Sequence, residues 1–83
     1  MPTVGALAGF RIVIYPNDHR PAHVHVIGGG CEAIFKLHCP DGPVELREDY
    51  GAPTRAQLRR IKADLTRRLA ELCAAWERIH GPV

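Results

Sequence analysis

Histidines and an aspartate gather in one short segment of the chain. Residues 17–26 read NDHRPAHVHV and include three of the five histidines, together with Asp18. Imidazole and carboxylate groups can exchange protons near neutral pH, bind transition metals or orient one another through hydrogen bonds. Histidines also occur on solvated strand faces without any function, but several titratable groups in one turn and strand start are hard to explain by folding alone. This segment is therefore the candidate functional site.

The spacing of His23 and His25 predicts how their side chains lie. Residues 23–27 alternate polar and apolar side chains, which is typical of a half-buried strand. Side chains two positions apart on a strand point to the same face, with roots roughly 6–7 Å apart. At that separation two imidazoles can hold one metal ion, one phosphate or one water. Asp18 and His19 lie in the turn just before the strand, where either could orient a ring.

The flanking sequence predicts the sheet that positions this segment. Residues 10–15 are rich in β-branched and aromatic side chains and predict a strand, and residues 3–7 predict a short edge strand. Residues 28–30 are three glycines, which we interpret as a hairpin loop because no helix start follows them. Strands at 31–38 and 44–48 complete an antiparallel meander of four or five strands.

Strict alternation assigns the side chains of this sheet to two faces. The inner face is expected to hold Ile12, Ile14, Val24, Val26, Ala33, Phe35, Leu37, Val44 and Leu46. The outer face is expected to hold Arg11, Val13, Tyr15, His23, His25, Ile34, Lys36, His38, Glu45 and Arg47. The outer face would be rich in histidine and partly cationic, unless a bulge reverses part of it.

A long amphipathic helix is predicted for residues 54–80. Thr54 and Gln57 have the spacing of a capping box. Apolar side chains then recur at steps of three and four, at Leu58, Ile61, Leu65, Leu69, Leu72, Trp76 and Ile79. Such a helix would be about 40 Å long, longer than the strands, so we expect a homodimer to cover its C-terminal half. The predicted fold class is α+β, a single domain over residues 1–83 with a sheet at 3–48 and one helix.

Charge and cysteine content bear on the partners and the cellular compartment of the protein. The net charge of +2 is too small to indicate a partner, and the three cysteines, Cys31, Cys39 and Cys73, lack C-x-x-C spacing. Neither a disulfide framework nor a cysteine-rich zinc site is therefore expected, and a reducing cytoplasm fits best. Residues 1–9 lack the basic segment of a signal peptide, and no apolar run is long enough to cross a membrane.

Basic residues are concentrated in the predicted helix. Residues 54–78 hold seven of the eleven lysines and arginines. Arg55, Arg59 and Lys62, here called the basic ridge, fall along one flank of this helix. The ridge could contact nucleic-acid phosphates or an acidic partner, although arginine-rich helix surfaces are more often simply solvated.

The sequence resembles a known family over nearly its whole length. The matching parts are residues 1–4, 9–12, 17–26 and 32–33 and the ending around Leu72, Ala75 and Trp76. They resemble the short bacterial proteins of the domain-of-unknown-function family DUF4160. That family has no settled activity, and its members are often encoded beside a second small protein, as toxins and antitoxins are. The resemblance thus implies a small protein partner encoded nearby. The connection at residues 39–43 looks longer than in typical members.

A ribonuclease is the first function that these features suggest. His23 and His25 would be the acid and base of a metal-independent, toxin-type RNA cleavage, and Asp18 or His19 would orient one of them. The phosphate would be held by Arg20 or Lys36, with the basic ridge as a further nucleic-acid contact. No cofactor is needed in this interpretation, and RNA is expected rather than DNA.

Metal binding is the second interpretation of the same cluster. Asp18, His19, His23 and His25 could be ligands of zinc or another divalent transition metal. A fourth ligand would then come from water, from His38 or from a second chain.

The third interpretation has no catalysis. The protein would be a regulatory or antitoxin-like protein that binds a partner or DNA through the basic ridge, and the histidines would be structural.

Overall fold

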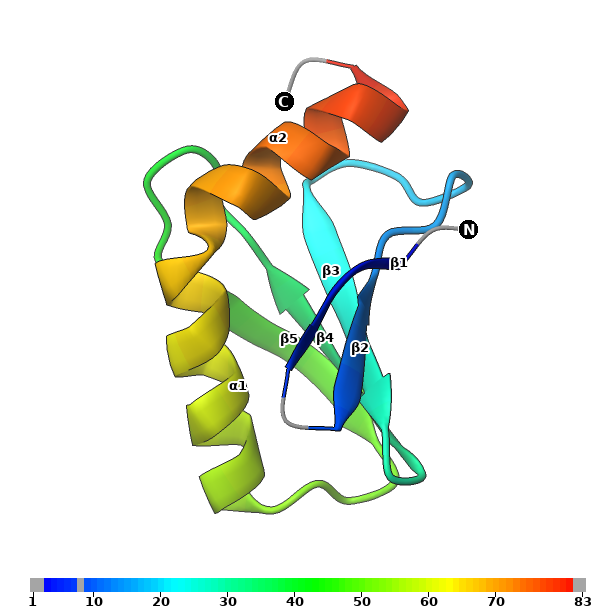
Figure 1. Ribbon diagram of the computed structural model, residues 1–83, viewed down its shortest axis with the longest axis vertical. Helices are drawn as coiled ribbons and strands as arrows, with labels where there is room; N and C mark the ends of the chain where they lie inside the picture. Colours follow the sequence, from blue (N-terminus) through cyan, green and yellow to red (C-terminus); the bar gives the residue numbers. More distant parts are fainter. Residues whose placement is uncertain (1–2, 8, 82–83) are drawn as a thin grey trace.

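Five strands form one antiparallel sheet in the computed structural model, which describes residues 3–7 and 9–81 (Figure 1). The strands are β1 (Thr3–Leu7), β2 (Phe10–Val13), β3 (His23–Gly28), β4 (Cys31–Lys36) and β5 (Glu45–Tyr50). They lie in the sheet in the order of the sequence, so the predicted meander is confirmed. The sheet extends to Tyr50, two residues beyond the predicted boundary at 48.

The predicted hairpin at residues 28–30 is present, but Gly28 belongs to β3 and the turn itself is only Gly29 and Gly30. Gly28 pairs with Cys31 across the ladder, and both residues between them have positive φ, +56° at Gly29 and +77° at Gly30. Glycine adopts such angles without steric strain. This turn fixes the register of β3 on β4, which places His23 opposite Lys36 and His25 opposite Ile34.

The C-terminal region contains two helices, so the prediction of one long helix is wrong. They are α1 (Arg55–Arg67) and α2 (Leu69–His80), joined at Arg68. The Arg68 guanidinium donates to the carbonyl oxygen of Ala6 at 2.8 Å, which anchors the break to β1. The predicted capping box is confirmed at the start of α1, where Gln57 N donates to Thr54 Oγ1 at 3.0 Å and Thr54 N donates to Gln57 Oε1 at 2.8 Å.

The break lets α2 follow a different direction from α1 across the end of the sheet (Figure 1). Leu72 and Trp76 are therefore buried within the single chain, and Ile79 stays partly exposed. The argument for a homodimer rested on an uncovered C-terminal half, and it loses that basis. The homodimer itself remains an untested prediction.

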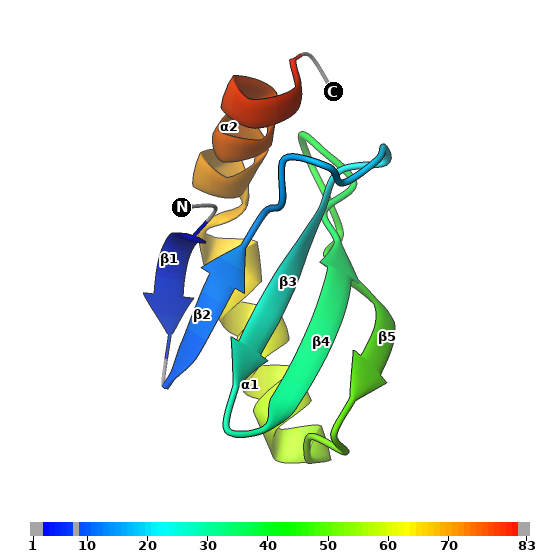
Figure 2. The same cartoon turned by 90° about the vertical axis from the view of Figure 1, so that its right-hand side faces the viewer.

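Both helices cover one face of the sheet (Figure 2) and share one apolar core with it. Eight of the nine side chains predicted for the inner face are buried: Ile12, Ile14, Val24, Val26, Ala33, Phe35, Leu37 and Val44. Leu46 pairs with Phe35 and so also lies on the inner face, as predicted, but it is 37% exposed because it lies on β5, an edge strand that is exposed along its whole length.

Cys39 and Cys73 form a disulfide, which the interpretation of the cysteines missed. It joins the loop after β4 to α2 across a sequence separation of 34 residues, and Cys31 remains free. An odd number of cysteines is compatible with one such pair. The expectation of a reducing cytoplasm therefore loses its main support.

Neither helix in the described part of the chain has the length and apolar character needed to cross a membrane.

Candidate functional site

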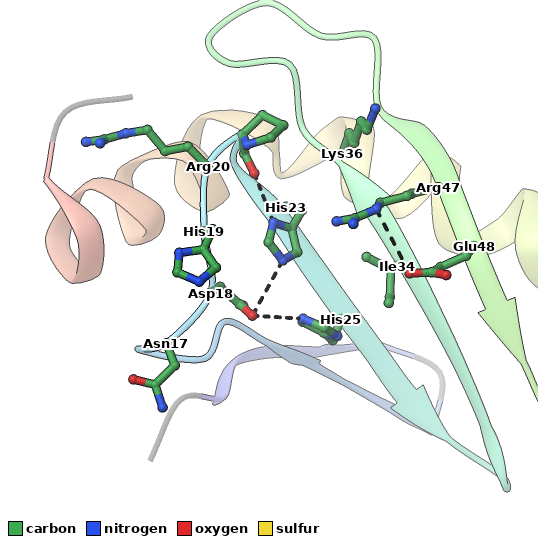
Figure 3. Close-up of a pocket in the computed structure, with 11 residues that line it drawn as sticks. Asn17, Asp18, His19, Arg20, His23, His25, Ile34, Lys36, Arg47 and Glu48 are labelled. Atoms are coloured by element: carbon green, nitrogen blue, oxygen red, sulfur yellow. Dashed lines mark hydrogen bonds and ion pairs between the residues drawn. The ribbon is translucent and has the colours of Figure 1, made fainter.

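A cavity of about 450 Å³ lies on the face of the sheet that the helices leave open (Figure 3). Its floor is formed by side chains of β3, β4 and β5, and residues 17–21 line it from the β2–β3 connection. All four predicted catalytic side chains line this cavity, namely Asp18, His19, His23 and His25. Two of the predicted phosphate-binding cations, Arg20 and Lys36, line it as well.

A tight turn positions Asp18. The Tyr15 backbone N–H donates to Asp18 Oδ2 at 2.9 Å, and the Asp18 N–H donates back to the Tyr15 carbonyl at 3.0 Å. Aspartate favours such turns because its short side chain can accept from a nearby backbone N–H. One carboxylate oxygen thus holds the turn, and the other, Oδ1, faces the histidines.

His23 is the first residue of β3, and its side chain is buried between the turn and α2. Its Nδ1 donates to the carbonyl oxygen of Pro21 at 2.9 Å. A carbonyl can only accept, so Nδ1 carries a proton, and the other ring nitrogen, Nε2, lies 3.5 Å from Asp18 Oδ1. The indole ring of Trp76 lies behind the imidazole, with ring centroids 5.3 Å apart.

His25 is held in the same way by a different acceptor. Its Nδ1 lies 2.8 Å from Glu32 Oε2, and its Nε2 lies 3.4 Å from Asp18 Oδ1. The edge-on Tyr15 ring, with its centroid 4.9 Å away, packs against the imidazole. The sequence interpretation missed Glu32, although the length of the glycine turn could have predicted its position. A two-residue turn at 29–30 places position 32 on the same face as position 25, one step along the ladder.

Three donor atoms converge as a result. Asp18 Oδ1, His23 Nε2 and His25 Nε2 lie within 4.8 Å of one another, and both nitrogens are 3.4–3.5 Å from the carboxylate oxygen. Ligand atoms on a tetrahedral zinc ion, each 2.0–2.1 Å from the metal, are about 3.4 Å apart. The cluster therefore has the donor types and nearly the spacing of a three-ligand metal site.

The other predicted site residues are not brought into this cluster. His19 lines the cavity without joining the three donor atoms. His38, considered as a fourth ligand, instead donates from Nε2 to Glu45 Oε1 at 2.7 Å. This hydrogen bond lowers the pKa of the Glu45 carboxyl. The basic ridge is exposed on α1, and none of its residues lines the cavity. Its contact with nucleic acid remains a prediction.

Arg20 reaches away from the cluster, toward the end of α2 (Figure 3). Its guanidinium donates to the His80 carbonyl at 3.5 Å, and the His80 ring nitrogen Nε2 lies 3.1 Å from the Tyr15 carbonyl oxygen. The His80 ring also stacks on Trp76. The C-terminal turn of α2 thus supports the β2–β3 connection that carries Asp18.

Comparison with known proteins gives one result. Searches of curated proteins and of solved structures found no match. A family model described as "Domain of unknown function (DUF4160)" matches residues 9–77, a range that contains Asp18, Glu32 and both histidines of the cluster. The match covers most of the 83 residues, so the chain belongs to the DUF4160 family.

Proposed function

We propose that the protein binds one divalent transition metal, with zinc as the best fit, through Asp18 Oδ1, His23 Nε2 and His25 Nε2. The observation that carries this proposal is the convergence of these atoms within 4.8 Å at the floor of a cavity. Two imidazoles and one carboxylate are ligands that zinc accepts, and the same set suits iron(II) and related ions.

The hydrogen bonds behind the two rings support this choice. Pro21 O and Glu32 Oε2 each accept from an Nδ1, so both Nε2 atoms are turned toward the same point, where each would offer its lone pair to a bound metal. Histidine ligands of metals usually have such an acceptor behind the ring, because it fixes the tautomer and makes the ligand nitrogen more basic. Finding the arrangement twice in one cluster is difficult to explain by sheet packing.

The number of ligands favours a catalytic type of metal site over a structural one. Structural zinc is normally bound by four protein ligands, whereas catalytic zinc has three and leaves a position for water or substrate. Among the described residues, the cluster has three members, and it opens into the cavity. The chemistry that the ion would supply is activation of a bound water or polarisation of a substrate oxygen.

A metal-independent ribonuclease is the second candidate. It is favoured by Lys36, which lines the same cavity as the histidines and could contact a phosphate. In-line displacement at phosphorus, however, places the attacking and leaving oxygens on opposite sides of the phosphate. An acid and a base serving those oxygens should straddle the group. His23 and His25 instead direct both Nε2 atoms at one carboxylate oxygen, which suits a shared ion better.

Metal titration tests the proposal. Calorimetry with Zn²⁺ on protein freed of metal by dialysis should give one site per chain, and Asp18→Asn should weaken it by about 100-fold or more because it replaces a charged ligand. His19→Ala is the matched control, since His19 lines the cavity outside the three donor atoms. It should bind Zn²⁺ as the wild type does. A wild-type protein that binds no Zn²⁺, Co²⁺ or Fe²⁺ would sink the proposal.

The single tryptophan gives an independent readout. Trp76 packs against His23, so an open-shell ion such as Co²⁺ at the site should quench its fluorescence. The quenching should disappear in Asp18→Asn and persist in His19→Ala. Cleavage of RNA in excess chelator, lost in His23→Ala and His25→Ala, would instead establish the second candidate.

A further inference from the structure

A bulge in β5 adds a cation to the floor of the cavity. In the β4–β5 ladder Ile34 pairs with Glu48 and Phe35 pairs with Leu46, so Arg47 is an extra residue in β5. A residue inserted in this way brings two consecutive side chains to the same face of a sheet. Arg47 and Glu48 accordingly both line the cavity beside Ile34. Figure 3 shows the Arg47 guanidinium directed over Ile34 toward the two histidines.

Lys36 adds a second cation beside the cluster. It pairs with His23 across β3 and β4, so the two residues are direct cross-strand neighbours on the same face. Lys36 has no salt bridge within the part of the chain that the structure describes, and Arg47 has only a long one, 4.0 Å from Nε to Glu48 Oε1. Glu48 also accepts a hydrogen bond from the Tyr50 hydroxyl at 2.9 Å. On its other side Lys36 pairs with Glu45, and its ammonium group is directed away from the histidines (Figure 3), so a ligand in the cavity would have to draw it over from Glu45.

The charges around the cavity favour an anion. Lys36 and Arg47 bring two positive charges to its lining, whereas the Arg20 guanidinium is directed toward His80. Asp18 and Glu48 bring two negative charges, which balance them with the histidines neutral. A divalent ion on the cluster would add two positive charges, and Glu32 behind His25 would remove one. The occupied cavity would thus carry an uncompensated charge of about +1, in a partly enclosed space where charges interact more strongly than in water.

We propose that this cavity binds the phosphate group of a phosphate ester, held between the metal on Asp18, His23 and His25 and the side chains of Arg47 and Lys36. The proposal deepens the metal-binding function and rests on it. A guanidinium fork, an ammonium group and a metal ion together match three phosphoryl oxygens, whereas a carboxylate offers two. The volume of about 450 Å³ leaves room for the esterified group beside the phosphate.

Phenyl phosphate is a suitable probe, with benzoate as a carboxylate of similar shape. Titrated into the Co²⁺-loaded protein, phenyl phosphate should change the visible absorption of the ion and bind at least about tenfold more tightly than benzoate. The double variant Lys36→Gln/Arg47→Gln should weaken phenyl phosphate binding by about tenfold or more, and it should not weaken Co²⁺ binding, because it removes only positive charges near the ion. Arg60→Gln, which removes an exposed arginine of α1 on the opposite face, is the matched control and should change neither.

The outcomes separate this inference from the metal centre. If Co²⁺ binds but phenyl phosphate does not, or binds equally to the double variant, the phosphate site is wrong and the metal centre stands. If no Co²⁺ binds, yet phenyl phosphate binds to the wild type and not to the double variant, the anion site stands and the metal centre is wrong. Benzoate binding as tight as that of phenyl phosphate would overturn the choice of phosphate.

A short single-stranded RNA identifies the source of the phosphate ester. Displacement of phenyl phosphate by the oligonucleotide would indicate a phosphodiester of nucleic acid as the natural ligand. Displacement by small phosphate monoesters alone would indicate a phosphorylated metabolite.

Discussion

Two histidine–carboxylate arrangements in this molecule use the same groups in different surroundings. His25 lies between Glu32 and Asp18 in the cavity, with a side chain 13% exposed. His38 contacts Glu45 in the open, where the side chains are 41% and 59% exposed. The exposed contact, at 2.7 Å, is the shortest of these histidine–carboxylate contacts. Contact distance therefore does not distinguish a candidate site from a surface pair. Convergence of several donor atoms and exclusion of water do.

The largest expected difference between the two histidines is in metal-induced stability. Zn²⁺ at about 100 times its dissociation constant should raise the free energy of unfolding by roughly 2.7 kcal/mol. For a domain of this size, that corresponds to a rise in Tm of about 10–20 °C. His25→Asn should abolish the rise, and His38→Asn should retain it, as measured by thermal unfolding with and without Zn²⁺. Equal responses of the two variants would remove the distinction drawn here between the cavity and the surface pair.

Substitution of the two carboxylates that contact these histidines should have a smaller effect, measured as a change in metal affinity. Glu32→Ala removes the acceptor that holds His25, and loss of such a partner typically lowers metal affinity by about 10–100-fold. Glu45→Ala removes the partner of His38 and should leave the affinity within about twofold of the wild type, since Glu45 contacts no proposed ligand. Competition with a chromophoric chelator measures both. A Glu32 variant with wild-type affinity would mean that the hydrogen bond is incidental to the site.

The smallest expected effect is a change in the pKa of Glu45 when its exposed partner, His38, is removed. The hydrogen bond from His38 lowers the pKa of the Glu45 carboxyl below its ordinary value of 4.5. This lowered pKa means that the pair stabilises the fold while Glu45 is ionised, and that the contribution is lost as pH falls through the lowered pKa. His38→Ala should raise the pKa of Glu45 toward its ordinary value in an NMR titration, with little change in overall stability because both groups are exposed. An unchanged titration would show that the pair is not formed in solution.

Local patterns predicted most of the elements and the core. Hydrophobic alternation placed the strands, the capping box at Thr54 marked the start of α1, and the histidine spacing put His23 and His25 on one face. These features depend on neighbours in the sequence, so a single sequence contains them. The position of Glu32 could also have been predicted, because a two-residue glycine turn fixes the register of β4 on β3.

Features set by distant contacts were not predictable in the same way. The apolar period continues across Arg68, where α1 ends and α2 begins and where the Arg68 guanidinium donates to Ala6 O in β1. The bulge at Arg47 has no glycine to mark it, and the pairing of Cys39 with Cys73 depends on the placement of α2. Each of these was decided by tertiary packing rather than by local preference.

The donor atoms of the cluster all come from one contiguous stretch, the turn after β2 and the start of β3. Their supporting acceptors, Pro21 and Glu32, lie in the same stretch or in the next strand of the hairpin. Within the described residues, α2 supports this group through Trp76, which packs on His23, and through His80, which contacts Tyr15 and Arg20. The ligands are therefore fixed by the turn, the hairpin and one end of α2, and substitutions on the exposed side of α1 are expected to displace them little.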